Sequence, residues 1–337
     1  MAKDRLNFCV FGAGRIGKLH ARNLAAHPRA RVSYIVDPMA RLAKDLAREV
    51  DAATAPDAAA ALADREVDAV VVASSTNTHV DLIAASVRAG KAVLCEKPID
   101  LDIRRVDRCL AELKKHRVPV AIGFNRRFDP TNRAIQAAIG RGEVGEVEQI
   151  VITSRDPAPP PLSYIKVSGG LFRDMMIHDF DLARWLLGAE PVEVVAKASC
   201  RVDPKIARAG DVDGAMVILK TRNSTLCHIN NSRRATYGYD QRVEVFGSKG
   251  MVRSDNLRPT AILTSNERAT DSRDVLLPFF VERYAQSYRH EIDDFIDAVL
   301  SRRKPSVGAE DGRRALLLAD AALQSHRTGK TVTVRAG

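Results

Sequence analysis

A carboxylate and an imidazole stand four positions apart in the second half of the chain, at Asp174 and His178. Side chains with this spacing share one face of a helix, so Asp174 can fix the tautomer of His178. The other ring nitrogen can then accept the proton of an alcohol, a task that suits a group with a pKa near neutrality. Gly169 and Gly170 stand just before the pair and would let a substrate come close. The spacing predicts a general base.

Two other interpretations of this segment compete with the general base. An Asp–His pair on a helix is often a solvated surface pair. His178, Asp179 and Asp181 also offer metal-ligand atoms, but no further ligand cluster accompanies them, so we expect no metal.

A lysine with a restricted backbone follows the predicted strand Lys91–Cys95, in the run Glu96-Lys97-Pro98. Charged side chains at the end of a buried strand are costly unless they have partners. Pro98 limits the backbone of Lys97 and so gives its side chain a defined direction. Beside a bound nicotinamide, an ammonium group can hold a substrate oxygen and stabilise a developing alkoxide. We predict this role for Lys97; a surface salt bridge is the alternative.

A glycine-rich turn follows the first predicted strand and opens a helix, with the sequence Gly12-Ala13-Gly14-Arg15-Ile16-Gly17. In a dinucleotide-binding turn the first glycine permits the bend, the second lets the backbone approach a pyrophosphate, and the third lets helix and strand pack closely. The helix N-terminus offers N–H groups and a partial positive charge to the anion. A purely structural turn is the alternative. The predicted cofactor contacts here are Gly12, Gly14, Arg15, Ile16 and Gly17.

An acidic residue, Asp37, ends the second predicted strand, 20 positions past Gly17. A carboxylate at this place accepts hydrogen bonds from the adenosine ribose and repels a 2′-phosphate. The cofactor is therefore expected to be NAD rather than NADP. Arg41, four positions on, would weaken that preference.

A polar turn, Ser74-Ser75-Thr76-Asn77-Thr78-His79, follows the predicted strand Asp68–Ala73. Ligands of open parallel sheets bind at the carboxyl ends of the strands. We therefore predict that this turn contacts the cofactor, as do Glu96 and Lys97. Helix capping by Thr76 or Asn77 is an alternative that does not exclude it. The predicted contacts of the turn are Ser74, Thr76, Asn77 and His79.

The elements that must position these groups alternate between strand and helix in the first third of the chain. The predicted strands are Leu6–Phe11, Arg31–Val36, Asp68–Ala73, Lys91–Cys95 and Pro119–Phe124. The predicted helices are Arg15–Ala26, Met39–Val50, Asp57–Ala63, Thr78–Ala89 and Leu101–His116. This alternation predicts an α/β fold with a parallel, doubly wound sheet, a Rossmann domain over residues 1–124.

The pattern then changes to strands separated by Gly, Pro and Asn. The predicted strands are Glu146–Ser154, Val192–Ser199, Gly214–Thr221, Thr225–Asn231, Arg242–Phe246, Thr260–Thr264 and Lys330–Val334. The predicted helices are Pro130–Ile139, Leu171–Leu187, Val281–Ser301 and Ala309–Thr328. We predict a second, α+β domain over residues 125–337 with a large, mostly antiparallel open sheet. The two late helices are candidates to pack back on the first domain.

Composition bounds the class of protein. The chain has 337 residues, 45% hydrophobic and 28% charged, which suits two globular domains. No apolar run approaches the ~18 residues of a membrane helix, and no apolar signal core opens the chain, so we expect a cytoplasmic protein. The five cysteines are scattered and expected to be reduced. The net charge of +10 is spread along the chain without a nucleic-acid motif, so a solvated basic surface is favoured over DNA binding.

These motifs together resemble the glucose–fructose oxidoreductase / inositol dehydrogenase (Gfo/Idh/MocA) family. The resemblance covers nearly the whole chain and is closest, over Ser154–Leu187, to bacterial inositol 2-dehydrogenases. Those enzymes oxidise myo-inositol to 2-keto-myo-inositol (scyllo-inosose). The matching runs are 12–17, 76–79, 96–98, Gly-Phe-Asn-Arg-Arg-Phe-Asp at 123–129, and Gly-Gly-x-Phe-x-Asp-x-x-x-His-Asp at 169–179.

The resemblance implies an NAD-dependent dehydrogenase that acts on a ring secondary alcohol of a cyclic polyol. Lys97, Asp174 and His178 would form the catalytic set, and these three would also bind substrate. Arg127, Asp156 and Tyr237 are implied as further substrate contacts. Another inositol isomer or a sugar remains an alternative substrate, and a non-catalytic NAD- and sugar-sensing regulator an alternative class. The family implies a homotetramer or homodimer, joined through the open sheet face.

Overall fold

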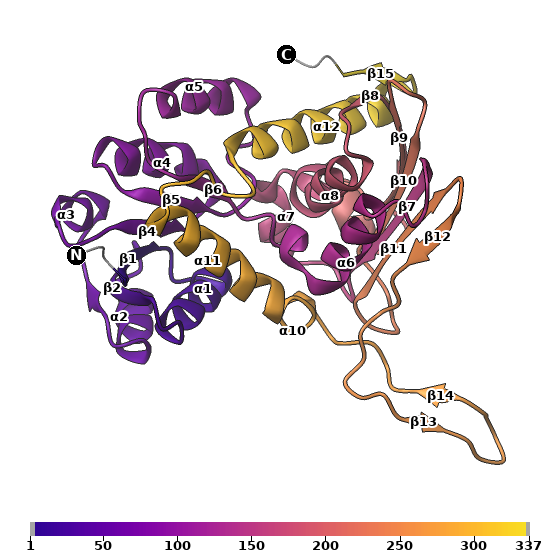
Figure 1. Ribbon diagram of the computed structural model, residues 1–337, viewed down its shortest axis with the longest axis horizontal. Coiled ribbons are helices and arrows are strands. Elements are labelled where there is room, and N and C mark those ends of the chain that lie inside the picture. Colours follow the sequence, from indigo (N-terminus) through magenta and orange to yellow (C-terminus); the bar gives the residue numbers. More distant parts are fainter. Residues whose placement is uncertain (1–3, 335–337) are drawn as a thin grey trace. The chain divides into compact units, whose positions relative to one another are not determined.

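The computed structural model describes residues 4–334, which form two compact units (Figure 1). The first unit extends to Asn125 and includes Tyr288–Leu316. The second unit comprises Arg126–Ser287 and the chain from Leu317 onward. The first boundary thus falls one residue beyond the predicted one, and the late segment returns to the first unit.

The first unit is built on a six-stranded parallel sheet in the order β3-β2-β1-β4-β5-β6. This order is that of a doubly wound dinucleotide-binding fold. The strands are β1 Leu6–Phe11, β2 Ala30–Val36, β3 Ala53–Thr54, β4 Ala69–Val72, β5 Ala92–Cys95 and β6 Val120–Ile122. Each of the four residues of β4, Ala-Val-Val-Val, is buried, as expected of a central strand covered on both faces.

Helices cover this sheet and complete its core. They are α1 Arg15–Ala25, α2 Ala40–Glu49, α3 Ala58–Ala63, α4 His79–Arg88, α5 Ile103–Leu113 and most of α11, Ala285–Leu300. The core of the sheet includes Ile292, Phe295 and Ile296 of α11, and the ring of Phe295 lies 6.2 Å from that of Phe8 in β1. The late helix is therefore a structural part of the cofactor-binding unit.

The second unit is built on a seven-stranded sheet in the order β12-β11-β7-β10-β9-β8-β15. Only β7 and β10 pair in parallel; the other neighbours are antiparallel. The strands are β7 Val147–Arg155, β8 Pro191–Ser199, β9 Gly214–Thr221, β10 Leu226–Ser232, β11 Asp240–Gly247, β12 Gly250–Arg253 and β15 Val332–Thr333. The predicted fold class, a parallel Rossmann sheet followed by a mostly antiparallel sheet, is confirmed.

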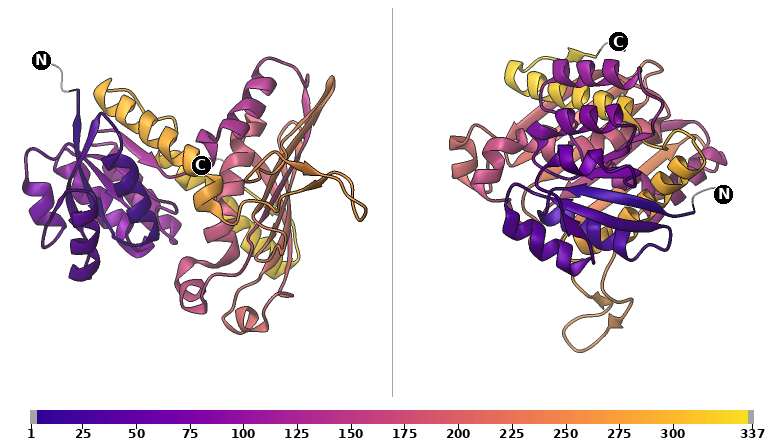
Figure 2. Two further views of the ribbon diagram at one scale, coloured as in Figure 1. Left: turned by 90° about the horizontal axis from the view of Figure 1, so that it is seen from below. Right: turned by 90° about the vertical axis from the view of Figure 1, so that its left-hand side faces the viewer.

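One face of the second sheet is packed against helices, as the left panel of Figure 2 shows. The helices of this unit are α6 Pro130–Gly140, α7 Leu162–Ser168, α8 Ile177–Leu187, α9 Pro204–Arg208, α10 Phe280–Arg283 and the end of α12, Ala309–Thr328. Inward residues of the strands alternate with outward ones, so Val217 is buried while Met216 and Ile218 are 60% and 48% exposed. The outer face of the sheet therefore presents apolar side chains.

The short elements β3, β12, α7 and α9 are not predicted from the sequence, and three predicted elements differ in the structure. Only Leu263–Thr264 of the predicted strand Thr260–Thr264 is a strand (β13), and it pairs with β14, Ser272–Arg273, outside the large sheet. The helix predicted over Val281–Ser301 is interrupted at Tyr284. The helix predicted over Leu171–Leu187 begins as a π-helical turn, because the Met176 N–H donates to the carbonyl of Leu171, five residues back.

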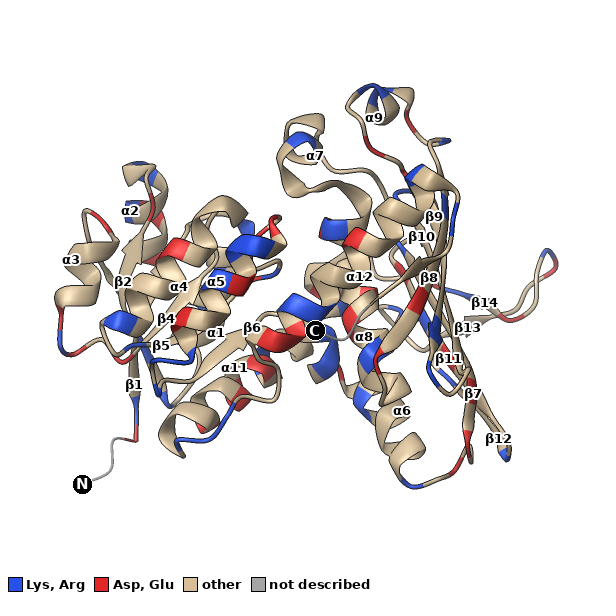
Figure 3. Cartoon of the chain, turned by 90° about the horizontal axis from the view of Figure 1, so that it is seen from above, with Lys and Arg blue, Asp and Glu red and all other residues tan. Residues whose placement is uncertain are grey.

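Lys and Arg residues are interspersed with Asp and Glu residues along the helices and strands of each unit (Figure 3). This distribution favours the solvated basic surface inferred from the sequence. Among the described residues, no helix has the length and hydropathy needed to span a bilayer.

Candidate active site

The glycine-rich turn has the geometry that close packing demands. Gly12 has φ +102°, and a Cβ there would lie 2.4 Å from the carbonyl oxygen of Ala73. A Cβ on Gly17 would lie 2.0 Å from the carbonyl oxygen of Gly12. Around Gly14, by contrast, no atom lies within 4 Å of the added carbon. The first and third glycines are required by the fold, whereas the second borders open space where a pyrophosphate fits.

Asp37 supports this turn from the end of β2. Its Oδ2 accepts a hydrogen bond from the Ala13 N–H at 2.8 Å, and its Oδ1 accepts one from the Met39 N–H at 2.8 Å. The side chain is half-buried. The carboxylate thus stands at the place predicted for ribose recognition. Arg41 pairs with Asp45 at 3.8 Å on the surface of α2.

The polar turn after β4 is a short 3₁₀ helix, Thr76–Thr78, held by hydroxyl groups. Ser74 Oγ lies 2.7 Å from Thr78 Oγ1, which also donates to the carbonyl of Ser75 at 2.7 Å. The residue that caps α4 is Thr78, and its side chain makes no capping hydrogen bond. Capping by Thr76 or Asn77, the alternative considered above, is therefore not what the structure shows.

His79 is buried between two backbone carbonyls of its own unit. Its Nδ1 lies 2.9 Å from Pro98 O and its Nε2 lies 3.1 Å from Ser74 O. Burial lowers the pKa of this imidazole. The ring ties the turn after β4 to the turn after β5, which favours a structural role over the predicted cofactor contact.

Lys97 stands just beyond β5 and is half-buried. The residue before it, Glu96, is anchored twice: its N–H donates to Val72 O at 2.9 Å, and its Oε1 lies 2.7 Å from His20 Nε2. The backbone that carries Lys97 is therefore held at the carboxyl ends of the central strands, where ligands of such sheets bind.

In the second unit, two glycines before Asp174 have different local roles: Gly169 ends α7 in the left-handed conformation, and Gly170 makes room for a protein carboxylate. Gly169 and Gly170 have φ +89° and +78°. A Cβ on Gly170 would lie 2.5 Å from Asp211 Oδ1, the oxygen that accepts the Leu171 N–H at 3.0 Å. The expectation that these glycines serve the close approach of a substrate is replaced by this local packing requirement.

Asp174 lies in the π-helical turn and is held by two groups. Its Oδ1 accepts a hydrogen bond from the Tyr164 hydroxyl at 2.9 Å, and its Oδ2 lies 3.8 Å from the guanidinium of Arg233. Arg233 is 1% exposed and also lies 3.6 Å from Asp211. His178 follows at the start of α8 and is half-buried.

Asp156 adds a third carboxyl group to this environment. Burial raises its pKa to about 6, opposed by the positive charges of Arg233 and Arg126 and assisted by the negative charge of Asp174. The predicted site residues Asp156 and Asp174 are therefore electrostatically coupled. A carboxyl group with this pKa changes its charge close to neutral pH.

The two neighbouring arginines are engaged by acidic residues of α8. Arg126 forms a buried ion pair with Asp179, whose Oδ2 also accepts from Asn231 Nδ2 at 2.9 Å. Arg127 binds Asp181 through two hydrogen bonds, with Nε 2.7 Å from Oδ2. The guanidinium predicted to face substrate hydroxyls is thus paired with protein, which favours a structural role for Arg127. The carboxylates considered as metal ligands are likewise paired with arginines.

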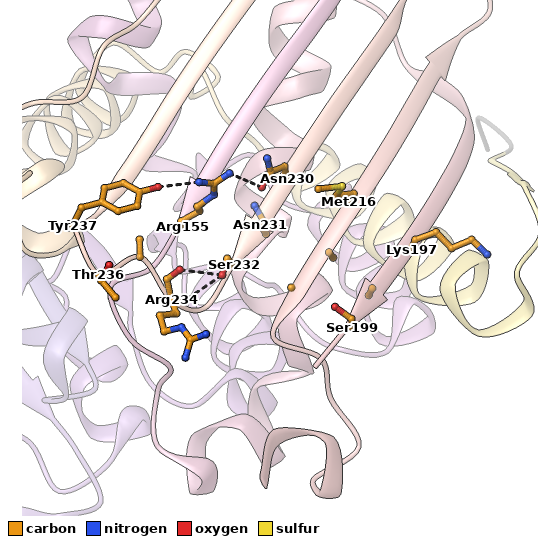
Figure 4. A pocket seen from close by; sticks show the side chains of 14 residues that line it. Arg155, Lys197, Ser199, Met216, Asn230, Asn231, Ser232, Arg234, Thr236 and Tyr237 are labelled. Atoms are coloured by element: carbon orange, nitrogen blue, oxygen red, sulfur yellow. Dashed lines mark hydrogen bonds between the residues drawn. The ribbon is translucent and has the colours of Figure 1, made fainter. Parts of the chain in front are cut away.

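Tyr237 lies on the outer face of the sheet, contrary to the expected wall of a substrate pocket. Its hydroxyl donates to Asp240 Oδ2 at 2.7 Å and accepts from Arg155 at 2.9 Å. Tyr237 and Arg155 border a hollow of about 580 Å³ that is also lined by Lys197 and Met216 (Figure 4). The hollow is lined by no carboxylate or imidazole, so it offers no general base for an alcohol.

Two family models match the chain. The oxidoreductase family NAD-binding Rossmann fold matches residues 6–124, and the oxidoreductase family C-terminal alpha/beta domain matches residues 136–334. Together they cover most of the chain. The chain belongs to the Gfo/Idh/MocA oxidoreductase family. It is an oxidoreductase with an NAD-binding Rossmann domain.

Similarity to individual members of the Gfo/Idh/MocA family extends over the full chain. An inositol 2-dehydrogenase of Rhizobium meliloti is 47% identical over 98% of this chain and 99% of its own length. A myo-inositol 2-dehydrogenase of Thermotoga maritima is 46% identical over 96% of this chain and 97% of its own. A crystal structure of a Corynebacterium glutamicum myo-inositol dehydrogenase matches with a TM-score of 0.95 at 44% identity, covering 99% of this chain and 100% of that one.

No local pattern in the sequence indicates the residues that hold Asp174 in this Gfo/Idh/MocA member. Tyr164 lies in α7, ten positions before Asp174, and Arg233 stands far along the chain, beyond β10. An arginine is common on any protein surface. Arg233 is distinguished by its burial, which depends on the tertiary structure.

Proposed function

We propose that this chain oxidises a ring secondary alcohol of an inositol with NAD, with myo-inositol to 2-keto-myo-inositol as the leading reaction. The observation that carries the proposal is the 47% identity to an inositol 2-dehydrogenase over 98% of the chain. The carboxyl-rich environment of Asp174 and Asp156 supports it, because carboxylates accept hydrogen bonds from polyol hydroxyls.

In the proposed reaction, His178 removes the proton of the reacting hydroxyl while Asp174 orients the ring. Asp174 is itself held by Tyr164 and Arg233, so its carboxylate keeps one position. Lys97 donates a hydrogen bond to the same oxygen and stabilises its negative charge. Bound NAD supplies the hydride acceptor. The chain contributes positioning and proton removal, and no covalent step is needed.

The residues around the glycine turn fit NAD. Gly14 leaves space at the start of α1, and the Asp37 carboxylate stands at the end of β2 beside the backbone of that turn. A carboxylate there favours a ribose with two hydroxyls over a 2′-phosphate. We propose that NAD is preferred over NADP. We also propose that this chain works in the cytoplasm.

The choice among isomers is open to a direct test. A solved scyllo-inositol dehydrogenase of Lactobacillus casei, with bound NAD(H) and scyllo-inositol, matches with a TM-score of 0.91 at 28% identity. Myo-inositol, scyllo-inositol, chiro-inositol and a set of aldoses should be compared by kcat/KM, using the absorbance of NADH. The highest value for myo-inositol is expected. A higher value for an aldose would contradict the proposal, and no turnover with any of them would favour a regulator.

We also propose that the outer face of the second sheet joins copies of this chain. That face carries the exposed apolar side chains Met216, Ile218, Leu226, Phe246 and Met251. Contiguous apolar side chains of this kind are typical of an interface rather than of a solvated sheet. A homotetramer or homodimer would bury them.

A further inference from the structure

Three ionisable side chains meet inside the first unit, away from solvent. They are His20 of α1, Glu96 after β5 and Glu291 of α11, and they are 0%, 9% and 2% exposed. One ligand atom from each lies within 4.8 Å of those of the other two. His20 Nε2 bonds to Glu96 Oε1 at 2.7 Å, whereas within residues 4–334 neither carboxyl oxygen of Glu291 has a hydrogen-bond partner. A buried polar group without a partner calls for an explanation.

The surroundings of these three residues, the His20–Glu96–Glu291 cluster, oppose a second negative charge. Burial raises the pKa of Glu291 well above the usual value, and the negative charges of Glu96 and Asp294 raise it further. On the other sides, the ring edge of Tyr288 faces His20 at 5.7 Å. Gly123 closes the space beyond, since a Cβ there would lie 3.0 Å from Glu96 Oε2. Ionising both carboxyl groups at this separation in a buried site costs free energy.

We propose that Glu291 keeps its proton in the folded enzyme, and that the His20–Glu96–Glu291 cluster positions the Glu96–Lys97 backbone for catalysis. This role rests on the proposed function of Lys97. A neutral Glu291 adds no negative charge beside Glu96, whose carboxyl group is bonded to His20. Ionisation of Glu291 would place a negative charge beside the Glu96 carboxyl group. The repulsion would displace Glu96 and, with it, the backbone of Lys97.

A metal ion is a different occupant that the same three side chains suggest. Tetrahedral ligands held at about 2.0–2.2 Å from zinc lie roughly 3.3–3.6 Å apart. His20 Nε2 and Glu96 Oε1 are closer than that, at 2.7 Å, which is the distance of a hydrogen bond. The distance therefore favours a hydrogen bond between His20 and Glu96 over a metal ion held by both side chains.

The protonation of Glu291 is tested by urea unfolding of the full chain with saturating NAD, comparing wild type with Glu291→Gln. Glutamine has the shape of a protonated glutamate but does not titrate. A carboxyl group that holds its proton only when folded contributes stability at low pH and loses it as pH rises towards its folded pKa. The unfolding constant of wild type should therefore rise about tenfold per pH unit relative to Glu291→Gln above about pH 5.

The control for lost negative charge is Glu282→Gln, since Glu282 is exposed. Its difference from wild type should not change with pH in this range. A pH-independent difference between wild type and Glu291→Gln would overturn the proposal. If Glu291→Gln does not fold, infrared spectroscopy of the wild type decides the matter: the C=O stretch of a protonated carboxyl should persist at neutral pH in the wild type, and its absence would also overturn the proposal.

The positioning role needs a kinetic readout. As pH rises, wild type should lose kcat before Glu291→Gln does, so the ratio of their kcat values should change with pH while the affinity for NADH stays equal. A constant ratio would show a structural role only. If no polyol is oxidised, the function proposal fails while the unfolding experiment still reports on Glu291. Stabilisation of wild type by added zinc, reversed by a chelator, would identify a metal site and overturn the proton assignment.

Discussion

Charge pairing inside the second unit determines what its acidic residues can do. Arg233 is the largest fully buried side chain and lies near both Asp174 and Asp211. Asp179 and Asp181 are paired with arginines, so they are held by protein. Asp174 lies near the buried Arg233, and the charges of Arg233 and Arg126 both act on Asp156. We propose that these two carboxyl groups meet substrate.

Loss of either proposed reacting group should abolish most turnover. We expect Lys97→Ala and His178→Ala each to lower kcat by about 10²–10⁴-fold, because proton removal and alkoxide stabilisation are lost. NADH affinity, measured by fluorescence titration, should stay close to that of wild type. Lys114→Ala, at an exposed position, is the matched control. Near-normal kcat in either active-site variant would refute its role.

Substrate affinity should depend on the ionisation of Asp156. Its pKa of about 6 exceeds the ordinary value of 3.8, so its stabilising contribution is present below about pH 4 and is lost as pH rises towards 6. The carboxylate that binds hydroxyls forms over the same range. KM for the polyol should therefore fall as pH rises through about 6, and Asp156→Asn should lack this dependence. An identical KM profile in both proteins would exclude Asp156 from the binding site.

Cofactor choice should depend on Asp37. We expect Asp37→Ala to weaken NAD binding, because ribose hydrogen bonds and the support of the Ala13 N–H are lost together. The ratio of kcat/KM for NADP to that for NAD should rise at least about tenfold, since one repulsive charge near a phosphate is worth roughly 1.4 kcal/mol or more. An unchanged ratio would mean that another residue selects the cofactor.

At the scale of elements, function is concentrated where regular structure ends. Lys97 follows β5, Asp37 follows β2, and Asp174 lies in the π-helical turn before α8. The turn is possible because Gly169 and Gly170 adopt positive φ angles and let Asp211 bind the backbone of Leu171. The strand and helix ends therefore determine where the reacting groups can point.

The steric role of Gly170 is open to a stability measurement. Gly170→Ala should destabilise the protein by about 2–3 kcal/mol, because a positive φ and a contact of 2.5 Å with Asp211 are combined. Gly188→Ala is the matched control, since Gly188 has φ +60° but no atom within 4 Å of its added Cβ. It should cost about 1 kcal/mol. Equal losses of stability in urea unfolding would show that contact with Asp211 is unimportant.

At the scale of the whole molecule, the chain divides its tasks between two units but not between two continuous segments. The first unit ends at Asn125 and is completed by Tyr288–Leu316. Phe295 of that returning segment packs with Phe8 of β1, and Glu291 joins the cluster before Lys97. The NAD-binding unit is therefore not expected to be stable as residues 1–124 alone.

Assembly should depend on the outer face of the second sheet. Met216→Glu combined with Ile218→Glu places like charges on two exposed apolar positions of β9. We expect the double variant not to form the wild-type multimer. Light scattering after gel filtration measures its mass, and circular dichroism checks that its fold is retained. Arg222→Glu, an exposed site just past β9, is the control. A variant that keeps the wild-type mass would place the interface elsewhere.

Local sequence determined a large part of the fold and of the cofactor site. Unbroken apolar runs such as β4 predict a sheet buried on both faces, and glycine spacing predicts the turn, because close approach leaves no space for a Cβ. The place of Asp37 follows from its position at the end of the second predicted strand, 20 positions past Gly17. Strand–helix alternation likewise separates the parallel first sheet from the mostly antiparallel second one.

Tertiary structure alone decided which polar residues are engaged by protein. His79, Arg127 and Tyr237 belong to motifs of the site, yet the first is buried against carbonyls, the second is paired with Asp181 and the third lies on the outer sheet face. Arg233 and Glu291 are identified as residues of interest only by their burial in the tertiary structure. The reason is physical: backbone conformation follows from neighbours in sequence, whereas desolvation and ion pairing depend on groups brought together from distant parts of the chain.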